Sequence, residues 1–187
     1  MAKPAVLTTS SLTSLLFNPK SLYIVSYGWL VGMSIWVTFF GGIIAFKALP
    51  RHQFGMLQHK TFPVYFVLSI LLSVGLTGYW TVSHPDVLEY INDPFVADVA
   101  QAYTLASVFL AQAANHLVIG PMTSKTMFQR QKLEKSEGKN YNEVSVSEEM
   151  KVLNRRFGIL HGISSMLNLW AVLALIFHGL WVGGNGI

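Results

Sequence analysis

The sequence predicts an all-α fold, an integral membrane four-helix bundle with a short basic connector between its first two helices. Charged residues make up only 12% of the chain, about half the share that is usual in a soluble domain. Hydrophobic residues make up 52% of it, and most of them lie in four long blocks without charged side chains. Each block is long enough to cross ~30 Å of hydrocarbon as a helix.

The chain divides into a lead and a membrane domain. Residues 1–20 are expected to form an N-terminal lead that is flexible or lies on the membrane interface. Residues 21–187 are expected to form the four-span domain, in which a hydrophilic loop at residues 123–156 separates the last two helices. The four helices are predicted at about residues 22–48, 62–83, 97–120 and 157–182.

The first helix carries small residues spaced four apart, a pattern that lets helix backbones approach closely in lipid. One row consists of Gly28 and Gly32, and a second consists of Ser34, Thr38 and Gly42. Packing within the bundle is the simpler interpretation of these rows. The alternative is the interface of a homodimer.

Local signals set the expected helix ends. Pro63 is expected in the first turn of the second helix, where the missing backbone donor costs nothing. The third helix is expected to continue past Pro121 and to be broken within residues 136–142. A capping box from Ser145 to Glu148 then predicts the start of the fourth helix.

The uneven distribution of basic residues predicts the orientation. The first and third connectors carry 11 of the 13 Lys and Arg residues, whereas the opposite side carries Lys3 and Lys20. Connectors rich in Lys and Arg stay in the cytoplasm, so both termini are expected to be lumenal or exoplasmic. This placement explains the net charge of +4 without a nucleic-acid partner. It also makes anionic lipid a candidate partner of the basic connectors.

No arrangement of residues indicates catalysis. The chain has no cysteine, which excludes disulfides, thiolate metal sites and cysteine nucleophiles. The uncharged blocks contain no acidic side chain to act as a general base. Ser164 and Ser165 follow His161 closely, but they lack an orienting carboxylate and a glycine elbow. We therefore expect a protein that is not an enzyme and that holds no cofactor.

Polar residues gather where the first connector would meet the adjoining ends of the third and fourth helices. In the fourth helix, four of them form one stripe, from His161 to Asn168, which in hydrocarbon should face the bundle to find partners. The candidate polar or ligand-binding cluster consists of Arg51, His52, Gln58, His59, Asn115, His116, His161, Ser164, Ser165 and Asn168.

Three interpretations of this cluster stay open. The simplest is an interhelical hydrogen-bond network that fixes helix register, with Arg51 as a topogenic anchor. The second is a path or site for a small polar solute or a proton. The third is a metal or haem site, because imidazole is the commonest metal ligand. His52 and His161 are its candidate ligands, although no two histidines are spaced four residues apart on one helix.

Several motifs resemble the transmembrane protein 205-like family. The first is the basic connector, where residues 49–66 read LPRHQFGMLQHKTFPVYF. The others are the third-helix exit with Asn115 and Pro121, and the fourth-helix segment from Phe157 to Leu169. The resemblance implies a four-helix integral membrane protein of the endomembrane system or plasma membrane, without an established catalytic activity. Members of that family are associated with tolerance of platinum drugs and with vesicle traffic.

These observations favour a scaffold or trafficking protein whose basic connectors dock anionic lipid or a partner. The alternative is a transporter or binding protein for a small solute or metal, which would work as a dimer and would use His52, Asn115, His161 and Asn168. The lead is rich in Ser and Thr and has no acidic residue. That composition is loosely typical of a mitochondrial transit peptide, so a mitochondrial membrane is the alternative location.

Overall fold

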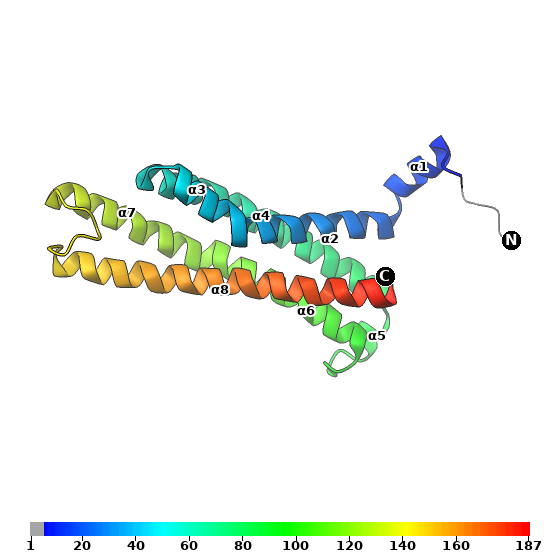
Figure 1. Ribbon diagram of the computed structural model, residues 1–187. Helices are drawn as coiled ribbons and strands as arrows, with labels where there is room; N and C mark the ends of the chain where they lie inside the picture. Colours follow the sequence, from blue (N-terminus) through cyan, green and yellow to red (C-terminus); the bar gives the residue numbers. More distant parts are fainter. Residues whose placement is uncertain (1–5) are drawn as a thin grey trace.

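The computed structural model describes residues 6–187, which form four long helical rods joined by short connectors (Figure 1). Each rod is long and apolar enough to cross a membrane, which confirms the predicted all-α fold with four spans. Two short helices, α1 (Thr9–Leu16) and α5 (Asp86–Glu89), lie outside the rods. The first rod consists of α2 (Pro19–Ile35), the π-helical segment η1 (Trp36–Gly41) and α3 (Gly42–Ala48), and the second rod is α4 (Arg51–Ser83). The third rod consists of α6 (Ala97–Ala114), the π-helical segment η2 (Asn115–Ile119) and α7 (Gly120–Glu137). The fourth rod is α8 (Glu148–Asn185).

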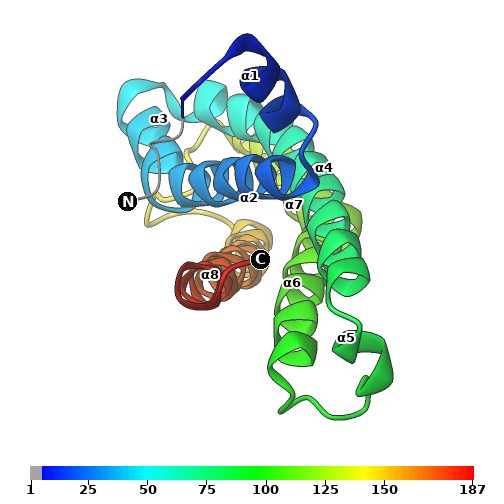
Figure 2. The same ribbon diagram turned by 90° about the vertical axis from the view of Figure 1, so that its right-hand side faces the viewer.

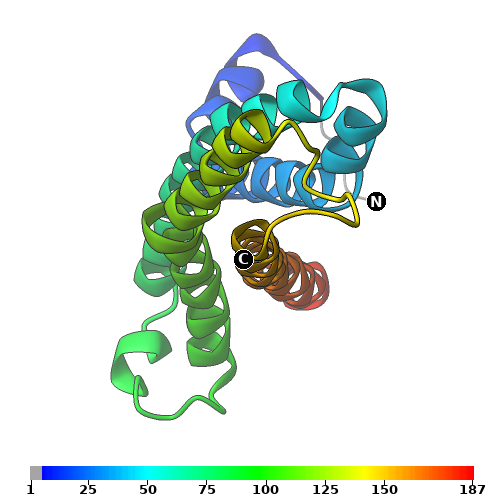
Figure 3. The ribbon, with the colours of Figure 1, turned by 90° about the vertical axis from the view of Figure 1, so that its left-hand side faces the viewer.

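The third rod is the centre of the assembly. Helix α6 packs against both α4 and α8, and α7 extends the contact with α8. The first rod packs on α4 through α2, and it also reaches α8. Figures 2 and 3 show α8 nearly end-on, beside the column formed by α4, α6 and α7. The side chains buried most completely between the rods include Leu30, Leu76, Trp80, Leu105 and Leu175.

Large apolar side chains also cover the outside of the rods. Leu71 and Leu110 are each 63% exposed, and Leu180 is 72% exposed. Continuous apolar surface of this kind would be unfavourable in water, but it is the surface that a bilayer solvates. The outer faces of the rods therefore contact the lipid chains.

Helix α4 begins at Arg51, well before the predicted start near residue 62. Pro50 precedes it with φ −54° and ψ 143°, an extended conformation that ends α3. The connector thus shrinks to Leu49 and Pro50, and the basic residues after it form the first turns of α4. Pro63 lies inside this helix and not in its first turn. The prediction erred because a lack of charge marks where hydrocarbon begins, not where a helix begins.

Helix α7 carries the third rod past the apolar span expected to end near residue 120 and through the first part of the hydrophilic loop. It ends at Glu137, within residues 136–142, where the helix was expected to break. Gly138 ends it with φ 63°, a left-handed conformation that glycine adopts without strain. Charged residues do not stop a helix, because their side chains reach water from its surface.

Helix α8 begins at Glu148, at the end of the segment in which a capping box was predicted and ahead of the apolar span expected at residues 157–182. Its N-cap is Ser147, whose hydroxyl accepts a hydrogen bond from the backbone N–H of Met150 at 3.1 Å. The capping box predicted at Ser145 is therefore wrong by two residues. The capping-box pattern favoured Ser145, because Glu148 stands three residues after it, whereas Met150 stands three residues after the true N-cap, Ser147.

The described part of the lead contains α1. Its N-cap is Thr8, whose hydroxyl accepts a hydrogen bond from the backbone N–H of Ser11 at 3.2 Å. Leu15, Leu16 and Phe17 are exposed on it, as in a helix that lies on a membrane interface. Residues 1–5, the other part of the predicted flexible lead, lie outside the described residues.

Three rods extend beyond their uncharged segments at the same end of the molecule, the left end in Figure 1. The extensions are residues 51–60 of α4, 125–137 of α7 and 148–156 of α8. Together with the loop at residues 138–147 they are called the connector head below. At ~1.5 Å per residue, the head projects ~15–20 Å past the apolar part of the rods.

Candidate functional site

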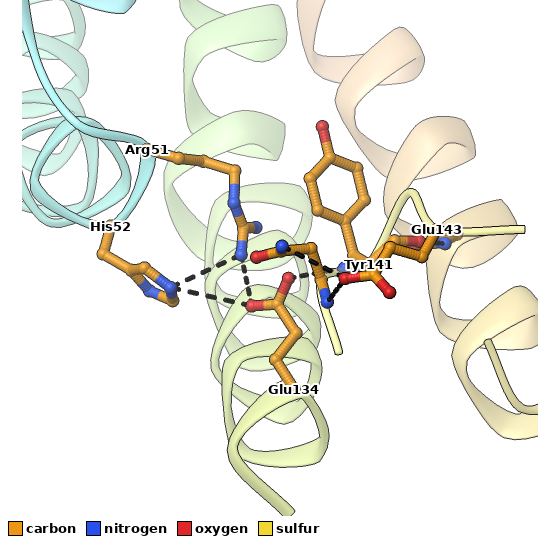
Figure 4. Close-up of polar contacts among 7 residues, drawn as sticks. Arg51, His52, Glu134, Tyr141 and Glu143 are labelled. Carbon is orange, nitrogen blue, oxygen red and sulfur yellow. Dashed lines mark hydrogen bonds and ion pairs between the residues drawn. The ribbon is translucent and has the colours of Figure 1, made fainter. Parts of the chain in front are cut away.

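Glu134 of α7 joins the first connector to the third. Its side chain is only 6% exposed, and its Oε2 accepts a hydrogen bond from Arg51 Nη2 at the start of α4. His52 Nε2 lies 3.8 Å from the same oxygen. Figure 4 shows these side chains pointing toward one another between the two helices. The predicted convergence of the first connector with the end of the third rod is thus present in the structure.

The loop after α7 folds back onto this ion pair through Tyr141. Its backbone N–H donates to Glu134 Oε1 at 2.8 Å. Its ring lies against two guanidinium groups, with Arg51 Cζ 4.4 Å and Arg130 Cζ 4.3 Å from the ring centroid. Asn154 of α8 donates to the Tyr141 carbonyl at 2.7 Å. These five residues, Arg51, Arg130, Glu134, Tyr141 and Asn154, form the polar clasp.

The polar clasp offsets part of its positive charge internally. Two guanidinium groups face one carboxylate, and the aromatic rings add further attraction because a cation is attracted to a ring face. Arg130 Cζ lies 4.6 Å from the Phe157 ring centroid as well as near Tyr141. Both oxygens of Glu134 already accept hydrogen bonds, so this carboxylate is held as a structural acceptor.

The remaining residues of the predicted cluster on α4 and η2 lie apart from the polar clasp. His59 Nδ1 is 3.0 Å from Ser124 Oγ, and its ring meets the edge of Phe128 at 5.0 Å between centroids. Gln58 is half-buried and reaches toward α3 at Gly42. His116 is half-buried in η2.

The polar stripe of α8 does not face the bundle as a whole. Asn168 is buried and Ser164 is half-buried, whereas His161 and Ser165 are exposed on the outer surface. The His161 ring stacks on Phe157 of its own helix at 5.9 Å. His161 and Asn168 point in nearly the same direction, because seven residues make almost two full turns. The expectation failed because the neighbouring rods cover α8 at Asn168 but leave it uncovered at His161.

Asn115 and Asn168 belong instead to a buried set of residues here called the inner polar layer. Asn115 Nδ2 lies 3.3 Å from both Asn168 Oδ1 and the Ser164 carbonyl, and it donates to both. Gln112, one turn away, donates to the Tyr65 hydroxyl at 3.3 Å, and Tyr65 donates to Ser34 at 3.2 Å. The layer links all four rods and consists of Ser34, Tyr65, Gln112, Asn115 and Asn168.

A local helix irregularity positions Asn115. Asn115 is the first residue of the π-helical segment η2, and its carbonyl accepts a hydrogen bond from the backbone N–H of Gly120. A Cβ atom at position 120 would lie 2.7 Å from that carbonyl oxygen, so glycine permits the close approach. Such single-turn π segments within α-helices are frequent at functional sites.

A second buried polar set, at the opposite end, was missed by the sequence analysis. His178 of α8 is 0% exposed, and its Nδ1–H donates to Gln101 Oε1 at 2.9 Å. Its Nε2 accepts from the Tyr23 hydroxyl at 2.5 Å. The sequence signal was present, since polar residues in an uncharged span need partners. We call Tyr23, Gln101 and His178 the outer polar layer.

Apolar side chains separate the two layers. Leu30, Leu105 and Leu175 are fully buried between them. The predicted histidines do not gather into a metal site: within residues 6–187, no group of three or more His, Cys, Asp or Glu is placed to hold a metal ion. The arrangement therefore offers two hydrogen-bonded layers and one ion-paired head.

Comparison with known proteins places this architecture in a family. A family model described as "Domain of unknown function (DUF4149)" matches residues 25–132. Transmembrane protein 205 of Danio rerio is 27% identical over 178 residues, which cover 88% of this chain and 90% of that protein. Xanthocillin biosynthesis cluster protein D of Aspergillus fumigatus is 25% identical over 164 residues, 87% of each chain. No solved structure matches.

The family match confirms the resemblance that the connector and fourth-helix motifs predicted. It spans the first two rods and most of the third, including Arg51, Tyr65 and Asn115. The four apolar rods and the similarity to transmembrane protein 205 agree with it. The chain belongs to the DUF4149 family and is a multi-pass, transmembrane protein 205-like membrane protein.

Proposed function

We propose that the protein is a non-catalytic scaffold of membrane traffic, with the connector head as its docking platform. The polar clasp is the observation that carries this proposal. It ties three helix ends and a loop into one unit outside the apolar part of the rods. A surface that is ordered before binding loses less conformational entropy when a partner docks, so more of the contact energy becomes affinity.

The charges of the connector head suit an acidic partner. Glu134 is buried within it, and the eight exposed Lys and Arg side chains outnumber its other four acidic residues, Glu137, Glu143, Glu148 and Glu149. Lys132 and Lys135 at the far end of α7, and Lys139 just after it, are placed to contact a partner protein, whereas Arg155 and Arg156 lie where the apolar part of α8 begins. The exposed set, here called the basic platform, is Lys60, Lys125, Lys132, Lys135, Lys139, Lys151, Arg155 and Arg156.

The orientation supports the proposal. Eleven basic residues lie at or near the connector head, and the positive-inside bias would keep them in the cytoplasm. Both termini and the connector around α5 would then be lumenal or exoplasmic. The family resemblance favours the endomembrane system or the plasma membrane as the location.

Cysteine accessibility tests the orientation cleanly because the natural chain has no cysteine. We expect Asn92→Cys, between α5 and α6, to react with a membrane-impermeant maleimide from the lumenal or exoplasmic side. Ser145→Cys, in the connector head, should react only after the membrane is permeabilised. Both positions are exposed, so the reverse pattern would place the connector head on the wrong side for the proposed scaffold.

Neutralising the far end of the basic platform tests docking itself. The triple variant Lys132→Gln/Lys135→Gln/Lys139→Gln is expected to shift the distribution of the protein among membrane fractions while leaving cysteine orientation unchanged. The matched control is Asp86→Asn/Glu89→Gln, which changes exposed charges at the opposite end and should leave the distribution unchanged. An unaltered distribution of the triple variant would contradict the platform.

A second candidate function, a site for a small polar solute, is favoured by the inner polar layer. Among the described residues, Ser69 Oγ, Gln112 Oε1 and Asn115 Oδ1 are buried without a hydrogen-bond partner. Unpaired oxygens are costly in an apolar interior, and a solute with N–H or O–H donors would satisfy them. The name of the fungal relative connects it with a biosynthesis cluster, which agrees with a role in handling a small product.

Passage of a solute would require a second copy of the chain, because four rods leave little room for a pathway. Gly28 and Gly32 of α2 are exposed, and a Cβ atom at either would have no heavy atom within 4 Å. Bare helix backbone of this kind permits close packing of a second copy in lipid. A homodimer through α2 therefore belongs to this second candidate.

The second candidate predicts that polar reagents reach the inner polar layer. Ser69→Cys, at a buried position one helical turn from Tyr65 of this layer, should react with a methanethiosulfonate that carries a small primary ammonium group. Ala171→Cys, at a fully buried position in the apolar core cluster, should resist the same reagent under the same conditions. If both cysteines resist it, the layer is a sealed structural network and the solute function fails.

A further inference from the structure

A groove lies between α7 and α8, outside both polar layers. Its volume is about 370 Å³. The apolar part of its lining, called the apolar wall, comes from both helices. Two arginines of α8 form the rest of the lining. The lining residues are Met122, Val152, Arg155, Arg156, Ile159 and Leu160.

The groove spans the boundary between the connector head and the apolar part of the rods. Arg155 and Arg156 are the last charged residues before the uncharged segment that runs from residue 158 to the end of the sequence. Met122, which α7 contributes to the groove, comes just before Lys125, the first basic residue of α7. This boundary corresponds to the level of a bilayer at which the polar headgroups give way to the acyl chains. A lipid bound here contacts the protein with both parts.

The two arginines of the groove differ from the other two of the chain. Arg51 pairs with Glu134, and Arg130 lies on the rings of Tyr141 and Phe157. Arg155 and Arg156 are exposed, and no ion pair involves either of them among residues 6–187. Their guanidinium groups are therefore available to an external anion, and a guanidinium matches the geometry of a phosphate.

We propose that this groove is the binding site of an anionic phospholipid. The phosphate and the anionic headgroup pair with Arg155 and Arg156, and the upper part of an acyl chain lies against Met122, Ile159 and Leu160. Basic pockets between membrane helices on the cytoplasmic side suit such headgroups. The proposal deepens the proposed function and rests on its orientation, because anionic lipid is concentrated in the cytoplasmic leaflet.

The apolar wall argues for a lipid and against a soluble phosphate. A soluble anion would satisfy the guanidinium groups but would leave the wall formed by Ile159 and Met122 without a partner. An acyl chain covers that wall and keeps the phosphate at the level of the arginines. Charge and shape thus indicate the same ligand.

Native mass spectrometry of the full-length protein, released from detergent that contains equal phosphatidylserine and phosphatidylcholine with identical chains, tests the site. The wild type should retain phosphatidylserine preferentially. Arg155→Gln/Arg156→Gln should lower this retention by at least about tenfold, since each basic residue contributes appreciably to anionic-lipid attraction. The matched control Lys132→Gln/Lys135→Gln removes equal charge far from the groove and should change retention less than about twofold.

A second variant tests the groove without changing its charge. Ile159 is exposed on the apolar wall, and a tryptophan at this position would fill the groove beside it. The variant Ile159→Trp should therefore displace phosphatidylserine although both arginines remain. Equal retention of the two lipids by the wild type would overturn the proposal. So would equal losses in the arginine and lysine variants, which would mean diffuse attraction. The variant of Lys132, Lys135 and Lys139 tests docking on the basic platform separately. A failure of the phospholipid site would therefore not contradict the platform, and a failure of the platform would not contradict the site.

Discussion

Replacing Glu134 by glutamine is expected to lower the free energy of unfolding by about 3 kcal/mol, the low end of the range for breaking a buried ion pair. The low end applies because the Arg51 side chain is 30% exposed, although that of Glu134 is only 6% exposed. The variant leaves two guanidinium groups, of Arg51 and Arg130, close to the same ring with no carboxylate to balance them.

Reversible unfolding in a bilayer-mimicking detergent, followed by helicity, measures this loss. The double variant Arg51→Ala/Glu134→Gln should lose less than the sum of the two single variants, because the pair is removed together. Lys151→Ala is the matched control: it breaks the exposed Lys151–Glu148 pair, which spans 2.6 Å with the side chains 54% and 85% exposed. That change should cost less than about 0.5 kcal/mol.

Equal effects of Glu134→Gln and Lys151→Ala would show that the polar clasp does not hold the connector head together. The pre-ordered platform would then lose its physical basis. The Glu134→Gln variant could lose protection from hydrogen exchange only in the connector head, while α6 and the half of α8 that contains His178 stay protected. That result would show that the head unfolds as a separate unit.

The fold was predictable because hydrocarbon imposes a strict requirement. A chain that crosses a bilayer must satisfy its backbone groups internally, and long uncharged segments such as residues 21–46 meet this requirement only as helices. The start of α4 was less predictable, because this helix begins in charged sequence, which places no limit on helicity. Pro50, by its extended conformation, marks the true start of α4.

The candidate site was predictable in part, for reasons of packing. The position of Arg51 and His52 at the connector predicted their meeting with the third rod. Their partner Glu134 was not identified, because it lies in the hydrophilic stretch after Pro121, where the many charged residues do not mark one helical face as the packed one. The extent of packing along α8 was the other obstacle: a single sequence does not show how far along the helix its neighbours cover it, so His161 was assigned to the interior together with Asn168.

The outer polar layer was missed because its three members come from three rods. Each of Tyr23, Gln101 and His178 is unremarkable in its own helix, and only the packing of α2, α6 and α8 brings them together. The aromatic residues near the start of the first rod suit a membrane interface equally well. Only tertiary contacts show that Tyr23 belongs to a buried hydrogen-bonded set and not to an aromatic belt at the membrane interface.

Replacing His178 by leucine is accordingly expected to lower the free energy of unfolding by about 3 kcal/mol, because it leaves two buried polar groups without partners. Leucine fills much of the same space, so the loss arises from the orphaned Tyr23 hydroxyl and the Gln101 amide. In the triple variant Tyr23→Phe/Gln101→Leu/His178→Leu, most of the stability should return, since no unpaired group remains.

His161→Leu is the matched control for this second prediction. His161 lies on the same helix but is exposed on its outer surface, where an apolar side chain suits lipid. Its replacement should change stability by less than about 0.5 kcal/mol, as for other surface positions. The same unfolding measurement compares the two. If His161→Leu proved the more damaging, the partners that stabilise α8 would have to lie on its exposed face, and the second copy of the chain would be the first place to look for them.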